Sequence, residues 1–181
     1  MVYVSTDYVF DGKKKSPYTE TDATNPLNIY GKSKLAGEKA VLELAHSPLI
    51  LRTSWLYSNY GINFVKKITQ ILKEKSSINV INDQVGSLTN AEDFAKVIIQ
   101  SLELEGIYHY SSEGACSWFD VALLIKETFN LNCIVQPIDS ESYNAKAIRP
   151  SYSLLSKEKI KNELNITIPK WDDELVRFLK T

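Results

Sequence analysis

The residues whose types and spacing could do chemistry are Tyr30 and Lys34, four positions apart. On a helix, residues four apart share a face, so the phenol and the ammonium group would point into the same space. A phenol holds its proton at neutral pH, and a fixed ammonium group nearby favours the phenolate, which eases proton transfer. The pair therefore suggests a proton donor with an electrostatic partner, although the same spacing also occurs on ordinary solvated helix faces.

The segment Gly31-Lys32-Ser33 resembles the end of a phosphate-binding P-loop. That motif requires a glycine five positions before Gly31, because its backbone wraps closely around the phosphates. Position 26 is Pro26, and Gly12 is the only earlier glycine. The P-loop interpretation therefore fails, and the pair of Tyr30 and Lys34 remains the chemically informative feature.

Strands and helices alternate along the chain. Runs rich in β-branched, aromatic and aliphatic residues predict strands at 2–6, 8–10, 49–53, 78–81, 107–110 and 134–137. Apolar residues at helical spacing predict helices at 29–45, at 62–75, from a capping box of Thr89 and Glu92 to Gly106, and from Ser117 onward. Two short helices are expected in the polar C-terminal stretch. This alternation predicts an α/β fold with a mostly parallel sheet covered by helices.

Polar residues follow the first predicted strand. Thr6 and Asp7 lie at what would be its carboxyl edge, where ligands bind in open α/β sheets. Together, Thr6, Tyr30 and Lys34 resemble the Ser/Thr, Tyr, Lys triad of the extended short-chain dehydrogenases/reductases. More narrowly, the segment 4–34 that holds them resembles the dTDP-4-dehydrorhamnose reductase family.

Further segments match the same family in order along nearly the whole chain. They are Arg52-Thr53-Ser54-Trp55-Leu56-Tyr57, Asn63-Phe64, Asp83-Gln84-Val85-Gly86-Ser87-Leu88-Thr89, Gly106-Ile107-Tyr108-His109, Cys116-Ser117-Trp118 and Arg149-Pro150-x-x-Ser153. One departure is Leu88, where the family usually has proline and where we expect a looser loop. A larger departure is that the glycines nowhere form the Gly-x-Gly-x-x-Gly turn that holds a cofactor pyrophosphate. The family's N-terminal dinucleotide-binding segment has no counterpart, so the resemblance predicts a catalytic fragment.

The resemblance implies NADPH- or NADH-dependent reduction of the C4 ketone of dTDP-4-dehydro-6-deoxy-L-mannose to dTDP-L-rhamnose. In this family assignment Tyr30 donates a proton to the ketone oxygen and Lys34 holds the nicotinamide ribose. Thr6 would hydrogen-bond the oxygen, and Asp7 would adjust the charge around it. The cofactor-binding residues implied are Ser5, Tyr30, Lys34 and Thr53. The substrate-binding residues implied are Thr6, Asp7, Tyr8, Trp55, Asn63, Gln84 and Arg149, with Ser153 and Thr89 as further candidates.

Several of these residues also have a plain structural interpretation. Trp55 and Tyr8 are candidates for packing on the sugar, but an aromatic residue that follows a strand is also typical of a core. Arg149 suits phosphate oxygens because its guanidinium group is planar and always charged, yet a surface salt bridge would use the same residue. Ser153 and Thr89 could equally be structural caps. The sequence leaves these alternatives open.

The fold implied is a partial Rossmann-type parallel sheet with a small substrate-binding lobe. We expect residues 1–58 and 78–112 to form the later Rossmann strands and helices, and residues 59–77 and 113–181 to form the lobe. Because the first strands of the family's sheet have no counterpart, the inner sheet edge would be exposed, and unpaired edges favour association. We therefore expect that the isolated chain is either poorly stable or covers that edge by self-association.

Composition argues against several classes of partner. A formal net charge of -1 provides no basic face for nucleic acid, and no apolar run is long enough to span a membrane. The N-terminus lacks the features of a signal peptide, so we expect a cytoplasmic protein whose Cys116 and Cys133 are reduced. His46 and His109 are isolated, which argues against a metal hydrolase or a Ser-His-Asp enzyme. No metal ligands are assigned, and the sequence carries no signature that decides for or against magnesium.

Two other functions remain open at this point. One is a non-catalytic relative that binds a partner or a nucleotide. The intact Thr6, Tyr30 and Lys34 count against it, whereas the missing glycine turn counts for it. The other is a sugar-nucleotide epimerase or dehydratase, which shares the triad and the fold. The segments 5–12 and 83–86 favour the reductase over that second alternative.

Overall fold

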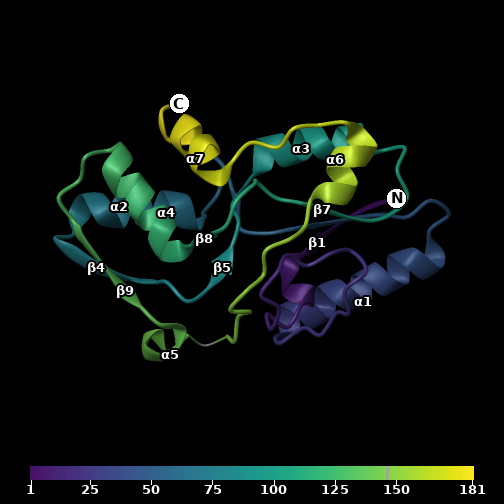
Figure 1. Ribbon diagram of the computed structural model, residues 1–181, viewed down its shortest axis with the longest axis horizontal. Coiled ribbons are helices and arrows are strands. Elements are labelled where there is room, and N and C mark those ends of the chain that lie inside the picture. Colours follow the sequence, from purple (N-terminus) through teal and green to yellow (C-terminus); the bar gives the residue numbers. More distant parts are fainter. Residues whose placement is uncertain (146) are drawn as a thin grey trace.

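A three-stranded parallel sheet forms the centre of one half of the molecule (Figure 1). The computed structural model describes residues 1–145 and 147–181. Strand β1 (Val2–Thr6) pairs with β2 (Leu49–Thr53), which in turn pairs with β7 (Gly106–Tyr110). The strand order is therefore β1-β2-β7, with β1 at an edge. Because β2 is central and covered on both faces, all of its residues are buried.

The two faces of this sheet are covered by different helices (Figure 1). Helices α3 (Ala91–Gln100) and α6 (Glu158–Leu164) cover one face. There they share an apolar core with alternate strand residues, which comprises Leu49, Leu51, Phe94, Val97, Tyr108, Tyr110, Ile160 and Ile168. Helix α1 (Ile29–Leu44) covers the other face. Its contact is close at Gly37, where an added Cβ would lie 2.1 Å from the Tyr3 hydroxyl. Alternation along the strands therefore separates an apolar layer from a more polar one.

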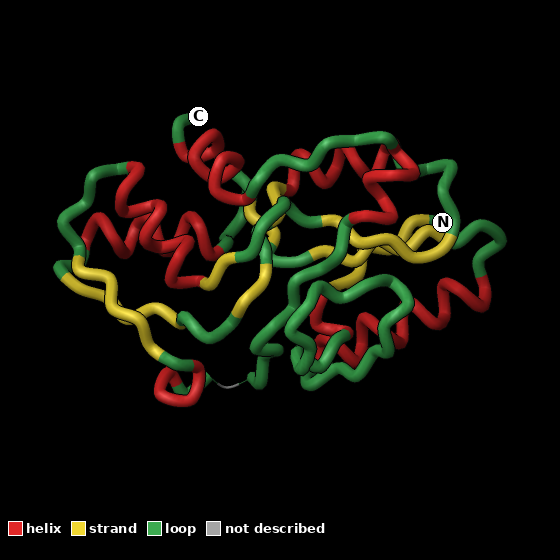
Figure 2. The backbone as a smooth tube through the Cα atoms, viewed as in Figure 1, coloured by secondary structure: helices red, strands yellow, loops and turns green. Residues whose placement is uncertain are grey.

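A second group of elements lies beside the sheet, on the left of Figures 1 and 2. Strand β4 (Ser77–Ile81) pairs in parallel with β9 (Ile134–Ile138). Helices α2 (Phe64–Glu74), α4 (Trp118–Thr128) and α7 (Trp171–Leu179) complete this group. Their shared apolar core comprises Tyr57, Val65, Ile68, Leu72, Val80, Leu88, Cys116, Val121, Ala122, Ile125, Cys133 and Leu175.

Short elements connect the two groups. Strand β3 (Leu56–Tyr57) pairs with β6 (Thr89–Asn90), and β5 (Val85–Gly86) pairs antiparallel with β8 (Cys116–Ser117). A single 3-10 turn, η1, spans Asp7–Val9, and the short helix α5 spans Ser140–Tyr143. Within residues 1–145 and 147–181, no helix has the length and apolar character that crossing a bilayer requires.

The predicted α/β class with parallel strands is confirmed, and several local predictions are wrong. Residues 8–10 do not form a strand, because the chain turns directly after β1 into η1. Thr89 does not cap α3. The next residue, Asn90, does so by accepting a hydrogen bond from the Glu92 amide at 3.0 Å. Gly106 does not close that helix but begins β7, and three C-terminal helices form where two were expected.

Two segments lie apart from the parts of the fold in which they were expected. Residues 77–81 pair with 134–138 and not with the three-stranded sheet, so the predicted Rossmann block 78–112 begins too early. Residues 158–168 pack against one face of the three-stranded sheet, although they fall inside the predicted lobe 113–181. Leu88, where a looser loop was expected, is only 1% exposed and belongs to an apolar core, because its side chain fills space between helices.

A buried ion pair joins α1 to the sheet. Arg52 on β2 donates two hydrogen bonds to Glu38 on α1, from Nε at 2.8 Å and from Nη2 at 2.7 Å. The hydroxyl of Ser5 on β1 donates to the same carboxylate at 2.5 Å. All three residues are at most 3% exposed. Because a buried carboxylate and a buried guanidinium each need a partner, this network fixes how α1 sits on β1 and β2.

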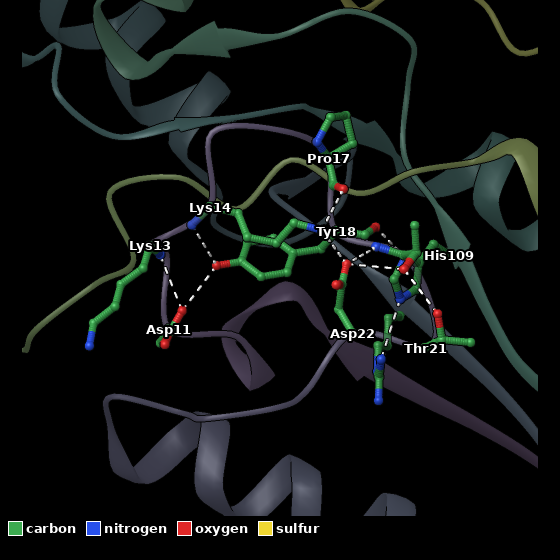
Figure 3. Close-up of polar contacts among 10 residues, drawn as sticks. Asp11, Lys13, Lys14, Pro17, Tyr18, Thr21, Asp22 and His109 are labelled. Atoms are coloured by element: carbon green, nitrogen blue, oxygen red, sulfur yellow. Dashed lines mark hydrogen bonds and ion pairs between the residues drawn. The ribbon is translucent and has the colours of Figure 1, made fainter.

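The network continues to β7 and to the loop that precedes α1 (Figure 3). His109 Nδ1 lies 3.1 Å from the Tyr18 carbonyl oxygen, which only accepts hydrogen bonds, so Nδ1 carries the proton. The other ring nitrogen, Nε2, then accepts from Arg52 at 3.4 Å. Burial first, and the Arg52 charge second, lower the pKa of His109 to about 3 and keep the ring neutral. Tyr18 also donates its hydroxyl to Asp11 at 3.1 Å, which anchors the loop.

We predict that Glu38→Ala destabilises the fold by about 3–5 kcal/mol, because Arg52 would then be a buried charge without its carboxylate. The measurement is the free energy of unfolding in urea. Glu43→Ala, at an exposed position of the same helix, is the matched control and should change it by less than about 0.5 kcal/mol. Equal effects of the two variants would contradict a structural role for the ion pair.

Candidate active site

The carboxyl ends of β1 and β2 and the start of α1 surround a cavity of about 390 Å³. We call it the triad cavity because Thr6, Tyr30 and Lys34 all line it. Its complete lining is Val4, Ser5, Thr6, Asp7, Tyr8, Tyr30, Lys34, Thr53, Ser54, Trp55, Leu56 and Trp118. The structure therefore brings together most of the residues predicted to serve in catalysis and cofactor binding.

The start of α1 holds Tyr30 at the mouth of this cavity. Asn28 caps the helix by accepting a hydrogen bond from the Gly31 amide at 2.9 Å. Gly31 is required for close packing, because an added Cβ would lie 2.2 Å from the Tyr8 carbonyl oxygen. Tyr30 itself is 55% exposed, and its ring meets that of Tyr8 edge to face at 5.9 Å between centroids. The phenol is therefore positioned by the helix cap while its surface stays open to a ligand.

Lys34 lies one turn further along α1 and lines the same cavity. Its Nζ lies 4.3 Å from the centre of the Tyr3 ring, a cation–π contact that holds the ammonium group. The Tyr3 hydroxyl also donates to the Lys34 carbonyl oxygen at 3.3 Å. An edge residue of the sheet thus holds both the backbone and the charged group of this lysine.

Thr6 and Asp7 are buried at the inner end of the cavity. The Thr6 hydroxyl lies 3.1 Å from Asp7 Oδ1 and accepts a hydrogen bond from the Tyr8 amide at 3.2 Å. Burial raises the pKa of Asp7 to about 7. Thr6, the nearby Ser153 and backbone amides oppose this effect without cancelling it. This carboxyl group therefore changes protonation near neutral pH.

A larger cavity of about 710 Å³ lies beside the first, and we call it the lobe cavity. Its walls come from α2, β4, Gln84 and Arg149, and Tyr8 and Trp118 line both cavities. The full lining is Tyr8, Phe64, Lys67, Ile68, Ile71, Lys75, Ser77, Ile78, Asn79, Val80, Ile81, Gln84, Trp118, Tyr143 and Arg149. Apolar walls with three cationic side chains suit a ligand that has both flat and anionic parts.

Two stacked tryptophans line the cavities, Trp118 both of them and Trp55 the triad cavity. The rings of Trp55 and Trp118 lie 3.6 Å apart at an interplanar angle of 14°. Trp55 has a φ of 46°, a left-handed conformation that is costly for a bulky residue and that marks functional sites. Gly86 makes room for this ring, since a Cβ there would lie 2.9 Å from it. Trp118 Nε1 donates to Gln84 Oε1 at 3.1 Å and so orients the amide at the lobe cavity.

Sequence reasoning assigned no role in the site to Trp118, Ser54, Lys67 or Lys75. Each lines a cavity. Trp118 and Ser54 were named only within segments that match the family or as part of a helix, and Lys67 and Lys75 lay only within a predicted helix. Two features of the sequence could have pointed to Trp118. It lies in the first turn of the helix that Ser117 caps, and a second tryptophan, Trp55, directly follows a strand and its polar end. Helical spacing alone assigns such a residue to the core.

Several of the predicted site residues already have hydrogen-bonding partners in the protein. Ser5 donates to Glu38, and Thr53 donates to Thr89 at 3.2 Å, although Ser5 and Thr53 both line the triad cavity. Asn63 lies outside the lining of both cavities. It caps α2 by accepting a hydrogen bond from the Lys66 amide at 3.1 Å.

Across residues 1–145 and 147–181, no three His, Cys, Asp or Glu side chains group as ligands for a metal ion.

Comparison with known proteins relates this arrangement to one family. The RmlD substrate binding domain model matches residues 1–181. A dTDP-4-dehydrorhamnose reductase of Salmonella typhimurium is 38% identical over 99% of this chain and 64% of its own length. The spore coat polysaccharide biosynthesis protein SpsK of Bacillus subtilis is 39% identical over 99% of this chain and 63% of its own length.

A solved structure agrees with these relatives. The crystal structure of dTDP-4-dehydrorhamnose reductase from Bacillus anthracis in complex with NADP superposes with a TM-score of 0.94 at 42% identity, over 99% of this chain and 65% of that one. The chain thus spans less than two thirds of the length of these relatives. The match over its full length shows that the chain belongs to the RmlD substrate-binding domain family.

Proposed function

We propose that this chain carries the catalytic and substrate-binding part of an NADPH-dependent reductase of a nucleotide-linked 4-keto sugar. The substrate proposed is dTDP-4-dehydro-6-deoxy-L-mannose, and the product is dTDP-L-rhamnose. The observation that carries the proposal is the meeting of Thr6, Tyr30 and Lys34 around one cavity at the carboxyl edge of a parallel sheet. The names of the Salmonella and Bacillus anthracis relatives support the same reaction.

The triad cavity fits the nicotinamide end of the cofactor. A phenol, an ammonium group and a hydroxyl line it, a donor set that suits ribose hydroxyls and a carbonyl oxygen. Lys34 and Tyr30 would both bind the ribose, while Ser5 and Thr53 would contribute polar groups to the wall of the cavity. When bound, the reduced nicotinamide supplies hydride to the carbonyl carbon. NADP in the Bacillus anthracis relative supports NADPH over NADH.

The side chains of this chain would handle the proton. Tyr30 would donate it to the ketone oxygen as that oxygen gains negative charge, a step typically worth about a hundred- to ten-thousandfold in rate. The Lys34 ammonium would stabilise the phenolate left behind. Thr6 would hydrogen-bond the same ketone oxygen, and Asp7 would set the charge beside it.

The lobe cavity would take the nucleotide part of the substrate. Three cationic side chains would face the diphosphate, because cations with several N–H donors suit phosphate oxygens. They are Arg149, Lys67 on α2 and Lys75 at the C-terminal end of α2. Tyr8 and Trp55 would pack on the sugar where the cavities adjoin, and Gln84 would reach a polar group of the ligand. In this proposal the lobe around α2, α4 and β4 is the substrate-binding part of the protein.

Two other functions are less well supported. A non-catalytic relative would not need the complete triad around one cavity. An epimerase or dehydratase would share the fold, but the relatives that share more than a third of their residues include reductases named for this substrate. We also propose that the protein acts in the cytoplasm and self-associates through the outer edge of β1, since that strand lies at an edge of the sheet.

The direct test is oxidation of NADPH in the presence of dTDP-4-dehydro-6-deoxy-L-mannose. It should be run with this chain alone and with this chain joined to the cofactor segment of the Bacillus anthracis relative. Turnover by either supports the reductase. The absence of turnover in both, with the nucleotide sugar still bound, would favour the non-catalytic relative.

We predict that Tyr30→Phe lowers kcat by about a hundred- to ten-thousandfold and leaves the affinity for the nucleotide sugar nearly unchanged, because the variant removes only the proton donor. Steady-state kinetics together with calorimetric binding separate the two effects. Tyr60→Phe is the matched control, since Tyr60 is 81% exposed and lines neither cavity. Unchanged turnover in Tyr30→Phe would overturn the catalytic assignment.

A second prediction concerns the diphosphate. Arg149→Met should weaken dTDP binding about tenfold or more, because a charge-assisted hydrogen bond to phosphate is worth roughly 1.5–3 kcal/mol. Calorimetric titration of this chain with dTDP measures the effect, and Lys39→Met on the exposed side of α1 removes the same charge elsewhere. If both variants bind dTDP as tightly as the native chain does, Arg149 does not contact the phosphates.

A further inference from the structure

We propose that Asp7 is a positioning residue whose protonation sets the direction of the Thr6 hydroxyl group. Only when Asp7 carries a proton is the Thr6 hydroxyl free to donate a hydrogen bond into the triad cavity. This inference rests on the proposed function, because the group that would receive the bond is the ketone oxygen of the substrate. It deepens that function by identifying what controls one of its hydrogen-bond donors.

The hydrogen-bonding capacity of Thr6 carries the argument. A hydroxyl group has one proton to donate and two lone pairs that accept. The Tyr8 amide occupies one lone pair, at 3.2 Å, and Asp7 Oδ1 lies 3.1 Å from the Thr6 oxygen. An ionised carboxylate only accepts, so it takes the single proton of Thr6. In that state the hydroxyl has nothing left to donate to a ligand.

A protonated Asp7 reverses this bond. The carboxylic acid then donates to the Thr6 oxygen, whose two lone pairs serve Asp7 and the Tyr8 amide. The Thr6 proton is released and can turn towards the cavity that Thr6 lines. The same pair of side chains, at the same 3.1 Å separation, therefore has two states that differ in what they offer to a ketone oxygen.

The surroundings of Asp7 allow both states near neutral pH. The residue is 2% exposed, and among the described residues Oδ2 has no hydrogen-bond partner. Ser153 lies near the carboxyl group and only partly offsets the burial that raises its pKa to about 7. The other titratable groups that line the two cavities are Tyr8, Tyr30, Lys34, Lys67, Lys75, Tyr143 and Arg149.

Among residues 1–145 and 147–181, no charged side chain contributes to the pKa shift of Asp7. The buried charges of Glu38 and Arg52 satisfy each other at 2.7 Å. Arg149 acts mainly on Tyr8, whose pKa is raised by burial and by the Asp7 charge and lowered by this arginine. Desolvation therefore dominates the titration of Asp7.

The kinetic test compares pH profiles of kcat/KM, measured with the active form of the enzyme, for the native protein, Asp7→Asn and Thr6→Val. The native profile should fall about tenfold per pH unit above its midpoint near 7, because the donating state is lost as Asp7 ionises. Whatever its absolute rate, Asp7→Asn should lose this limb, since an amide N–H can donate to Thr6 at every pH. Thr6→Val should be slow at every pH, and adding Asp7→Asn to it should change nothing further. If Asp7→Asn retains the native limb, the proposal is wrong.

A second measurement does not depend on turnover. Carbon-13 NMR of the aspartate carboxyl groups follows the titration of Asp7 in the native chain and in Thr6→Val. Because the hydroxyl stabilises the carboxylate, its removal should move the midpoint to higher pH. An unchanged midpoint would overturn the Thr6–Asp7 coupling even if the chain proves to be a reductase. A shifted midpoint would support the coupling even if the proposed substrate is wrong.

Discussion

The ion pair between Glu38 and Arg52 is the interaction on which the geometry of the site depends. Glu38 is one helical turn beyond Lys34 and two turns beyond Tyr30, so whatever fixes Glu38 also fixes the rotation and height of α1. Arg52 holds it bidentately from the central strand, and Ser5 holds it from the strand that leads directly into the triad threonine. A buried pair of this kind adds little net stability compared with apolar packing. Its value here is that only one placement of the helix satisfies both charges.

A second constraint acts where the two groups of elements meet. The Trp55 ring stacks on Trp118 at 3.6 Å, and its backbone takes a left-handed φ of 46° to do so. Such strain persists only where the surrounding packing outweighs it, and here the bare backbone of Gly86 gives the ring its space. Trp118 belongs to α4 and also holds Gln84, so one aromatic contact links the sheet edge to both cavities. The packing of Trp55, Trp118 and Gly86 therefore determines how the triad cavity and the lobe cavity lie relative to each other.

The burial of Asp7 gives the candidate site a carboxyl group that titrates near neutral pH, and it lowers the stability of the folded chain at that pH. A carboxyl group whose folded pKa lies near 7, above its ordinary value of 3.8, binds more protons in the folded chain than in the unfolded chain between these two values. Stability is then greatest below about pH 4 as far as this group is concerned, and it declines as the pH rises towards 7. An apolar residue would avoid that cost. Local conflicts of this kind are expected at functional sites, where burial tunes a titratable group at some cost to the fold.

Periodicity in the sequence was enough to predict the alternation of strands and helices and the parallel sheet class. The family resemblance singled out Thr6, Tyr30 and Lys34, which the structure places around one cavity. The helical spacing also predicted that α1 begins near residue 29, and the structure has it at Ile29. Three features became known from the folded chain alone: residues 77–81 pair with 134–138, Asn90 and not Thr89 caps α3, and Trp118 stacks on Trp55. These outcomes depend on contacts between residues that are far apart in the chain. A local sequence pattern does not contain the free energies of such contacts. The same reason explains Asp7: its identity is read from the sequence, but its desolvation comes from the fold packed around it.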